Sequence, residues 1–208
     1  MRTHDWRHPK SFKRERIMDL IPPEDREHPW HYGIWDGKVT VAFGYAEYGW
    51  IPMAIMTTTF NRSMVVHCSE VFDPFPDMQR WLEQIAGKQL PADWEIDEEG
   101  KKTLLRVKAD KDDQLDFQIW RYSYPENPKY PPQFKLRARI ERVQLLREFY
   151  RRFTRYVGED FDPQHWPMEP DEIRAARENI LDLRHVDLSM VLKEIERVSD
   201  KQKEFRAE

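Results

Sequence analysis

The residues of this chain best suited to chemistry are its histidines, its single cysteine and one run of carboxylates. His67 and Cys68 are adjacent in the sequence. The acidic run follows and consists of Asp93, Glu95, Asp97, Glu98 and Glu99. A histidine beside a cysteine can act as base and nucleophile, and grouped carboxylates can hold a divalent ion. The sequence therefore offers two candidate sites for hydrolase or nuclease chemistry.

Neither candidate has the surroundings that this chemistry needs. His67 and Cys68 fall in a predicted strand, where successive side chains point to opposite faces, so the two cannot act together directly. The acidic run includes Asp97-Glu98-Glu99-Gly100, which is typical of a hairpin turn, and charged turn residues are usually solvated. We therefore expect no catalytic residue and no metal here. Cys68 has no second cysteine to pair with and is expected to be a buried thiol.

The other histidines and the standard motifs lead to the same expectation. Two histidine pairs have spacings that suit a metal on a helix, His4 with His8 and His28 with His31. Pro29 disrupts the second pair, and Pro9 weakens the first. The sequence contains no glycine-rich phosphate loop, G-x-S-x-G elbow, H-E-x-x-H pair or Walker motif. It therefore favours a protein without catalysis and without a cofactor. The alternative is a small metal-dependent hydrolase or nuclease that uses the acidic run and a histidine such as His31 or His67.

Aromatic and basic residues are the candidates for binding a partner. The aromatic group lies among glycines and contains Trp30, Tyr32, Trp35, Tyr48 and Trp50. The basic group is a four-residue stripe on a predicted helix, made of Arg147, Arg151 and Arg155. Trp, Tyr and Arg are the residue types that dominate protein interfaces. Each group also has a purely structural explanation. The aromatic residues can cover a small core. The arginines can pair with Glu148 or with the acidic C-terminal helices.

The composition indicates a globular protein with strong charge segregation. Of 208 residues, 39% are hydrophobic and 35% are charged, and the net charge is -4. Residues 135–155 carry eight basic and two acidic side chains, whereas residues 159–208 carry fourteen acidic and eight basic ones. No apolar run approaches the roughly 20 residues of a membrane span, and the N-terminus lacks the apolar core of a signal peptide. We therefore expect no membrane span and a cytoplasmic protein.

A change of hydrophobic period within residues 133–158 predicts a strand that runs directly into a helix. The strand part alternates apolar and charged residues, with Phe134, Leu136, Ala138 and Ile140 on the buried face. The helix part repeats apolar residues every three or four positions, at Leu146, Phe149, Tyr150, Phe153 and Val157. Gly158 is expected to end this helix in a left-handed conformation.

Shorter patterns predict the elements around this pivot. Residues 39–43, 53–60 and 64–67 are expected to be strands, the last two forming a hairpin about Asn61-Arg62. A helix follows with one face made of Met78, Trp81, Leu82 and Ile85, and it ends at Gly87. Runs at 94–97, 103–109 and 114–122 alternate as a meander, with 133–140 as its fourth strand. The fold class is therefore α+β, an antiparallel sheet of a hairpin plus a four-strand meander, covered by two helices.

Three parts follow along the chain. Residues 1–30 form an arm with basic residues and prolines, 31–167 form the α+β core domain, and 168–208 form charged amphipathic helices. Trp166 is expected to lock the end of the core domain against its body. The last part should contain one helix opened by Pro170, with Leu183 on its apolar side, and a second one over residues 188–205. Because isolated short helices are marginal in water, these helices must pack on the core, on each other or on a partner.

Three segments resemble a set of uncharacterised bacterial α+β proteins. They read SEVFDPFPDMQRWLE at 69–83, EIDEEG at 95–100 and FYRRF at 149–153. Some proteins of that set are thought to be immunity partners of polymorphic or contact-dependent toxins. The resemblance implies a class and no functional residues.

We therefore expect a non-catalytic bacterial binding protein, immunity-like or adaptor-like, with a charged and aromatic surface. Its partner would be a protein, such as a toxin or a second copy of the chain. A second alternative, besides the hydrolase or nuclease, is a nucleic-acid-associated factor in which the basic arm and the arginine stripe contact phosphates.

Overall fold

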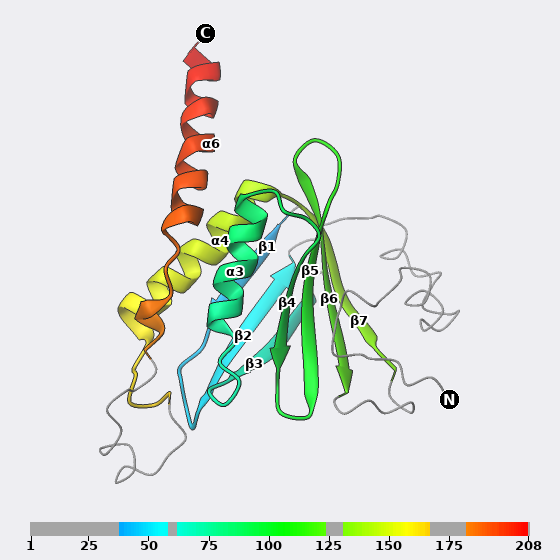
Figure 1. The fold of residues 1–208 in the computed structure, drawn as a ribbon, viewed down its shortest axis with the longest axis vertical. Coiled ribbons are helices and arrows are strands. Elements are labelled where there is room, and N and C mark those ends of the chain that lie inside the picture. Colours follow the sequence, from blue (N-terminus) through cyan, green and yellow to red (C-terminus); the bar gives the residue numbers. More distant parts are fainter. Residues whose placement is uncertain (1–37, 58–61, 124–130, 167–181, 208) are drawn as a thin grey trace.

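The computed structural model describes residues 38–57, 62–123, 131–166 and 182–207, and these fold as two antiparallel sheets with helices on one side (Figure 1). The three-stranded sheet has the order β1-β2-β3, with β1 at Val39–Phe43, β2 at Trp50–Thr57 and β3 at Arg62–Ser69. The four-stranded sheet has the order β4-β5-β6-β7, with β4 at Ala92–Asp97, β5 at Lys101–Ala109, β6 at Gln114–Ser123 and β7 at Gln133–Glu141. The predicted α+β class, with a hairpin and a four-strand meander, is confirmed.

The helices carry the residues that the sequence pattern assigned to them. The three α-helices of the described ranges are α3 at Phe75–Ala86, α4 at Arg142–Arg155 and α6 at Ser189–Ala207. Two short helical segments, the π-helix η2 at Tyr156–Asp160 and the 3-10 helix η3 at Leu183–His185, complete the set. In α3 the predicted face is buried, and the helix ends before Gly87 as expected. The left-handed conformation falls one residue later, at Lys88, whose φ is 58°.

One core lies between the helices and the sheets. Trp81 of α3 packs edge-on against Phe149 of α4, with ring centroids 5.1 Å apart, and both contact Trp94 of β4. Further along α4, Phe153 packs against Phe75 of α3 at 5.4 Å, and Phe75 meets Trp166 at 5.8 Å. Aromatic rings in such edge and offset contacts gain about 0.5–1.5 kcal/mol per pair beyond their buried area. Trp166 is fully buried, so the predicted lock at the end of the core domain is confirmed.

The predicted passage from strand to helix is also confirmed. Strand β7 ends at Glu141 and α4 begins at the next residue, with Glu141 still in an extended conformation. Phe149 and Phe153 are 0% and 2% exposed, so the apolar side of α4 faces the core. The same chain segment thus supplies the edge strand of the four-stranded sheet and a helix that covers both sheets.

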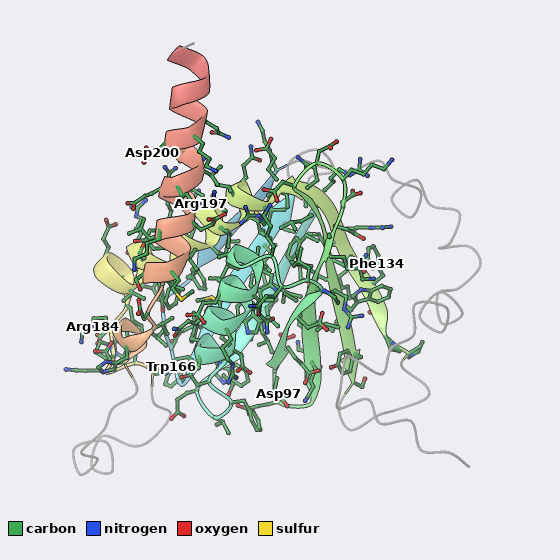
Figure 2. All side chains as sticks on the ribbon, turned by 45° about the horizontal axis from the view of Figure 1, so that its top comes forward. Asp97, Phe134, Trp166, Arg184, Arg197 and Asp200 are labelled. Atoms are coloured by element: carbon green, nitrogen blue, oxygen red, sulfur yellow. The ribbon has the colours of Figure 1, made fainter. Side chains whose placement is uncertain are left out.

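Phe134 lies on the opposite face from the one that the alternation predicted. A bulge shifts the register of β7 against β6: Leu136 pairs with Ile119, but Phe134 pairs with Trp120. Because one extra residue reverses the facing of all residues beyond it, Phe134 leaves the face shared by Leu136, Ala138 and Ile140. Its ring instead contacts Trp120 at 4.8 Å on the side of the sheet away from the helices (Figure 2).

Gly158 does not end the helix, and this prediction was wrong. The coil continues after α4 as η2, and Phe161 donates its backbone N–H to the carbonyl of Tyr156 at 2.8 Å. Gly158 is not among the residues with positive φ. Packing explains the difference, since the Tyr156 ring stacks on Phe43 at 5.4 Å and contacts Phe161 at 5.9 Å. The chain therefore stays coiled until both rings have reached the core.

The last helix packs on the core of its own chain. Leu188, Val191 and Ile195 belong to the same core as the sheets and α3 and α4. Figure 1 shows that the C-terminal part of α6 extends beyond the rest of the molecule. Leu183 lies in η3 and not in a long helix, and the predicted helix from Pro170 falls outside the described residues. No helix in the described part of the chain combines the length and the apolar content that crossing a membrane requires.

Arg142, the first residue of α4, is buried and joins four elements. Its guanidinium donates to Asp113 in the β5–β6 turn at 3.1 Å, to Glu194 of α6 at 2.7 Å and to the carbonyl of Ala86 in α3 at 3.3 Å. Although partial burial raises the pKa of the Asp113 carboxyl, hydrogen bonds from Arg142 and Lys88 outweigh it and leave the pKa below its usual value. Hydrogen bonds from Arg197 and Arg142 likewise lower the pKa of Glu194, against a smaller effect of burial.

Val191→Ala tests the docking of α6. Val191 is 0% exposed, so removing its methyl groups should lower the free energy of unfolding by about 2 kcal/mol. Met190→Ala is the matched control, because Met190 is 59% exposed on the same helix turn and should change stability by less than about 0.5 kcal/mol. Urea unfolding followed by circular dichroism measures both, and equal effects would contradict the docking.

Arg142→Met tests the junction and its pH dependence. The free energy of unfolding at neutral pH should fall by about 2 kcal/mol, because Asp113 and Glu194 lose their shared cation. Both carboxyls have lowered pKa values in the folded state, so their stabilisation is present above the unfolded pKa of about 4 and is lost as the pH falls through the folded values. The difference between wild type and variant should therefore shrink on acidification.

Urea unfolding at a series of pH values measures this. The control is Arg155→Met, which removes an exposed pair with Glu159 and should leave the pH profile unchanged. A constant difference between wild type and Arg142→Met across the acid range would contradict the assignment.

Candidate binding surface

The outer face of the three-stranded sheet is the side that α4 does not cover. Because side chains alternate along a strand, the register between the strands fixes which residues share this face. We call its exposed and half-buried part the uncharged face, and this part consists of Thr40, Ala42, Trp50, Pro52, Ala54, Met56, Ser63, Val65 and His67. Ser69 pairs with Trp50 and lies on the same side, but it is buried. Each of these side chains is exposed or half-buried, while the intervening ones are buried in the core where described.

The composition of the uncharged face departs from that of the chain. Charged residues make up 35% of the whole sequence, yet the nine positions include no Lys, Arg, Asp or Glu. Met56 and Val65 are 37% and 43% exposed, and the His67 side chain is 47% exposed. Six of the nine side chains are apolar, and the other three are Thr40, Ser63 and His67. A contiguous patch that is uncharged and mostly apolar, on a strongly charged protein, is typical of a surface that another molecule covers.

The loop between β1 and β2 lies at one end of the three-stranded sheet and carries two exposed aromatic side chains. Tyr45 and Tyr48 are each 77% exposed. Tyr48 and Gly49 form a tight turn, closed by paired backbone hydrogen bonds between Glu47 and Trp50 at 2.9 and 3.0 Å. Tyr48 has a φ of 50°, a left-handed conformation that glycine or asparagine adopts more readily. A strained, exposed tyrosine contributes little to the core, and strain of this kind gathers at functional sites.

The patch continues around the Tyr48 end. The ring of Trp50 meets the His67 ring edge-on, with centroids 6.4 Å apart. After β3 the chain turns back beside the same loop, where Glu70 donates its backbone N–H to the Gly49 carbonyl at 2.8 Å. Val71 and Phe72 follow and are 57% and 50% exposed. Large apolar side chains are thus exposed on two neighbouring loops at this end of the sheet.

Both edges of the three-stranded sheet are closed by side chains. On β1, the backbone N–H of Val41 donates to Glu148 of α4 at 3.0 Å. On β3, the N–H of His67 donates to Glu98 at 3.0 Å, and the carbonyl of Val65 accepts from Arg121 of β6 at 2.7 Å. Since the groups that would pair with a further strand are already bonded at these positions, strand addition is disfavoured. A partner of this sheet is therefore expected to bind its face.

Glu98 is the centre of the contact between the two sheets. Its side chain is 0% exposed, although the acidic turn was expected to be solvated, and that expectation was wrong. The carboxylate accepts from the Thr103 hydroxyl at 2.6 Å, from the His67 backbone at 3.0 Å and from Arg121 at 3.1 Å. The hairpin itself is as predicted, with Glu99 and Gly100 at positive φ. Glu98 points inward because β3, β5 and β6 each supply a donor for its carboxylate.

The structure separates the predicted binding residues into different places. Trp30, Tyr32 and Trp35 lie outside the described residues. Tyr48 and Trp50 lie at one end of the uncharged face. The arginine stripe lies on α4, which packs on the other side of the sheet, so the two groups do not form one surface.

The arginines of the stripe have different surroundings. Arg147 donates to the Ser199 hydroxyl of α6 at 3.1 Å, and Arg155 pairs with Glu159 at 2.7 Å. Arg151 is exposed. Glu148 pairs with Arg152 at 3.0 Å and not with a member of the stripe. The contact with the acidic C-terminal segment is made chiefly by Arg142, which the spacing did not single out.

The three acidic residues on β4 pair with basic side chains on the outer side of the four-stranded sheet, and Asp97 does so with Lys102 at 3.8 Å. Asp93 pairs with Arg106 at 2.7 Å and Glu95 pairs with Lys102 at 2.6 Å. Glu95 also accepts from the Tyr122 hydroxyl, whose pKa is raised by burial and by the Glu95 charge. Among the described residues, no group of three or more His, Cys, Asp or Glu side chains is placed to hold a metal ion.

His67 and Cys68 face opposite sides of β3, as predicted. His67 is on the uncharged face, and Cys68 is 0% exposed in the core as a free thiol. Burial raises the pKa of Cys68, with further contributions from Glu98 and Asp73. A buried thiol held in the protonated form is a poor nucleophile. His4, His8, His28 and His31 lie outside the described residues.

Comparison of the chain with protein-family models, with curated proteins and with solved structures found no match. The surface is therefore interpreted from its own residues. Sequence reasoning identified Tyr48 and Trp50 but missed the uncharged face as a whole. The sequence did contain a pattern that indicates this face. Alternate residues of 50–56 and 63–67 are all uncharged, while the residues between them suit a core.

Glu98→Gln tests the contact between the sheets. The substitution keeps the shape of the side chain but leaves Arg121 without its buried counter-charge, so the free energy of unfolding should fall by about 3 kcal/mol. Glu47→Gln, at an exposed position, is the control and should change it by less than about 0.5 kcal/mol. Chemical denaturation measures both variants. A Glu98→Gln protein as stable as wild type would contradict the central role of this carboxylate.

Proposed function

We propose that this chain is a non-catalytic bacterial protein-binding protein, immunity-like or adaptor-like, that holds its partner on the uncharged face. The observation that carries the proposal is the exposed, charge-free composition of this face on a chain with 35% charged residues. Trp50 and Tyr48 supply the aromatic anchors that dominate the energetics of most protein interfaces. Of the two groups that the sequence suggested for binding, the proposal therefore retains the aromatic residues Tyr48 and Trp50 and assigns them to the uncharged face.

The geometry of the surface supports a protein partner. A three-stranded face is shallow and broad, whereas small ligands are usually held in concave pockets that bury most of their surface. The closed sheet edges favour contact through side chains over the addition of a strand. A toxin bound and neutralised in this way is the partner class that the immunity-like resemblance implies. We further propose a cytoplasmic location, which the free thiol of Cys68 supports.

The two alternatives receive less support from the described residues. For a hydrolase or nuclease, Asp93, Glu95 and Glu98 would need to be available, but each is bonded to a basic side chain. For nucleic-acid binding, the arginine stripe would need to present its charges together, but Arg147 contacts Ser199 and Arg155 pairs with Glu159. Among the described residues, neither alternative has a surface comparable to the uncharged face, and the basic arm at residues 1–30 lies outside them.

Capture of the partner from the native host tests the proposal. Tagged wild-type protein, Trp50→Ala and Tyr48→Asn are compared, with Arg151→Ala on α4 as the matched control. Tyr48→Asn is the sharper variant, because asparagine suits the left-handed turn and should leave stability equal or higher. Loss of an aromatic anchor should weaken capture of one defined protein by roughly tenfold, while Arg151→Ala captures it as well as wild type.

The result can contradict the proposal in two ways. One is that no protein is captured by wild type at any salt concentration. The other is that the same protein is captured equally by wild type, Trp50→Ala and Tyr48→Asn, which would place the interface elsewhere. Thermal unfolding of each variant separates loss of binding from loss of the fold.

A further inference from the structure

Among the described residues, carboxylates outnumber basic side chains around the Tyr48 end of the uncharged face. The acidic residues near this end are Glu47, Glu70, Asp73 and Glu99. Glu47 is part of the turn that carries Tyr48, and Glu99 accepts a hydrogen bond from Ser69, which pairs with Trp50 across the strands. The basic residues that the described part of the chain places nearby are Lys101 and Arg121, and both interact with Glu98, whose side chain is buried. The aromatic end is therefore rimmed by net negative charge.

Two ionisable groups near this end, Asp73 and Cys68, have pKa values that neighbouring carboxylates help to raise. Burial raises the pKa of Asp73, a hydrogen bond from the Phe75 backbone opposes it, and the charge of Glu70 raises it further. After burial, the charges of Glu98 and Asp73 are the next causes of the raised pKa of Cys68. Both pKa values are raised in part by neighbouring carboxylates, which agrees with a negative potential at this end of the face.

Exposed aromatic rings beside carboxylates form a surface suited to cations. The face of a Trp or Tyr ring attracts Lys and Arg side chains by about 0.5–1 kcal/mol at exposed sites. Arg in particular can stack its planar group on a ring and direct its N–H donors to a nearby carboxylate. Tyr48 is 77% exposed, and Trp50 lies one turn residue away on the same side as His67.

We infer that the uncharged face takes a basic segment of its partner protein, with Lys or Arg side chains lying over Tyr48 and Trp50 at the acidic end. The apolar stems of these side chains cover the rings while their charges meet the surrounding carboxylates. The rest of the face, from Pro52 to Met56 and Ser63 to Val65, contacts uncharged parts of the partner. This inference rests on the proposed function and specifies the chemistry of the partner.

A titration with amidated hexaarginine peptide tests the inference on the full chain. The readout is the chemical shift of backbone amides and Trp indole N–H groups, with the Trp50 indole assigned through Trp50→Phe. The shifts should concentrate at Tyr48, Trp50 and His67. Tyr48→Asn and Glu47→Lys should each weaken the peptide affinity roughly two- to fivefold, the size of one exposed cation–π or ionic contact. Arg151→Ala is the control and should not weaken it.

Three outcomes would overturn the inference. The peptide shifts residues away from the Tyr48 end, such as the Asp110–Asp113 turn, or hexaglutamate produces the same shifts. Alternatively, the same amides shift with protein concentration in the absence of peptide, which would identify a second copy of the chain as the occupant.

The salt dependence of partner capture separates this inference from the proposed function. A basic partner should be captured more weakly at about 0.5 M salt than at about 0.1 M, since salt screens exposed charges. If capture depends on Trp50 but not on salt, the proposed function stands and the basic partner does not. If capture does not depend on Trp50, the proposed function fails as well.

Discussion

The contact between the two sheets depends on one buried carboxylate. Glu98 leaves the β4–β5 turn and reaches the open edge of β3, where it accepts the His67 N–H, while Arg121 bonds both Glu98 and the Val65 carbonyl. A strand edge buried without such partners would leave donors and acceptors unsatisfied, at a cost of about 1–3 kcal/mol for each group. The Glu98–Arg121 pair thus continues the hydrogen bonding of β3 across to the four-stranded sheet. Next to this pair, the Ser69 hydroxyl of β3 donates to Glu99 of the same turn.

This constraint also shapes the candidate binding surface. Glu98 accepts a backbone N–H of β3, and Glu148 of α4 accepts a backbone N–H of β1, so both edges of the three-stranded sheet have occupied donors. The helices cover the inner face of this sheet. The outer face is then the part of this sheet that the described residues leave uncovered. It lacks charged residues, and the strained turn at Tyr48 places an exposed ring at its acidic end. Charges close the edges of the sheet, and apolar and aromatic groups form its open face.

The comparison between sequence and structure is clearest at β7 and α4. The change of period at residue 141 located the strand-to-helix junction because side-chain spacing reports local backbone geometry directly. The facing of Phe134 could not be obtained in the same way. A bulge opposite Trp120 reverses it, and a bulge depends on how two strands fit together. The prediction that Gly158 ends the helix was wrong for a similar reason. The packing of Tyr156 on Phe43 keeps the chain helical beyond Gly158.

The sequence by itself determined the fold class, the strands of the hairpin and meander, the buried sides of α3 and α4, and the opposite facing of His67 and Cys68. These features follow from periods of two and about three and a half residues, which the chain encodes locally. Only the tertiary structure decided the burial of Glu98, the role of Arg142, the docking of α6 and the separation of the aromatic residues from the arginine stripe. The physical reason is that a charge is buried only where distant residues supply its partners, and those residues meet only after the sheets and helices have packed.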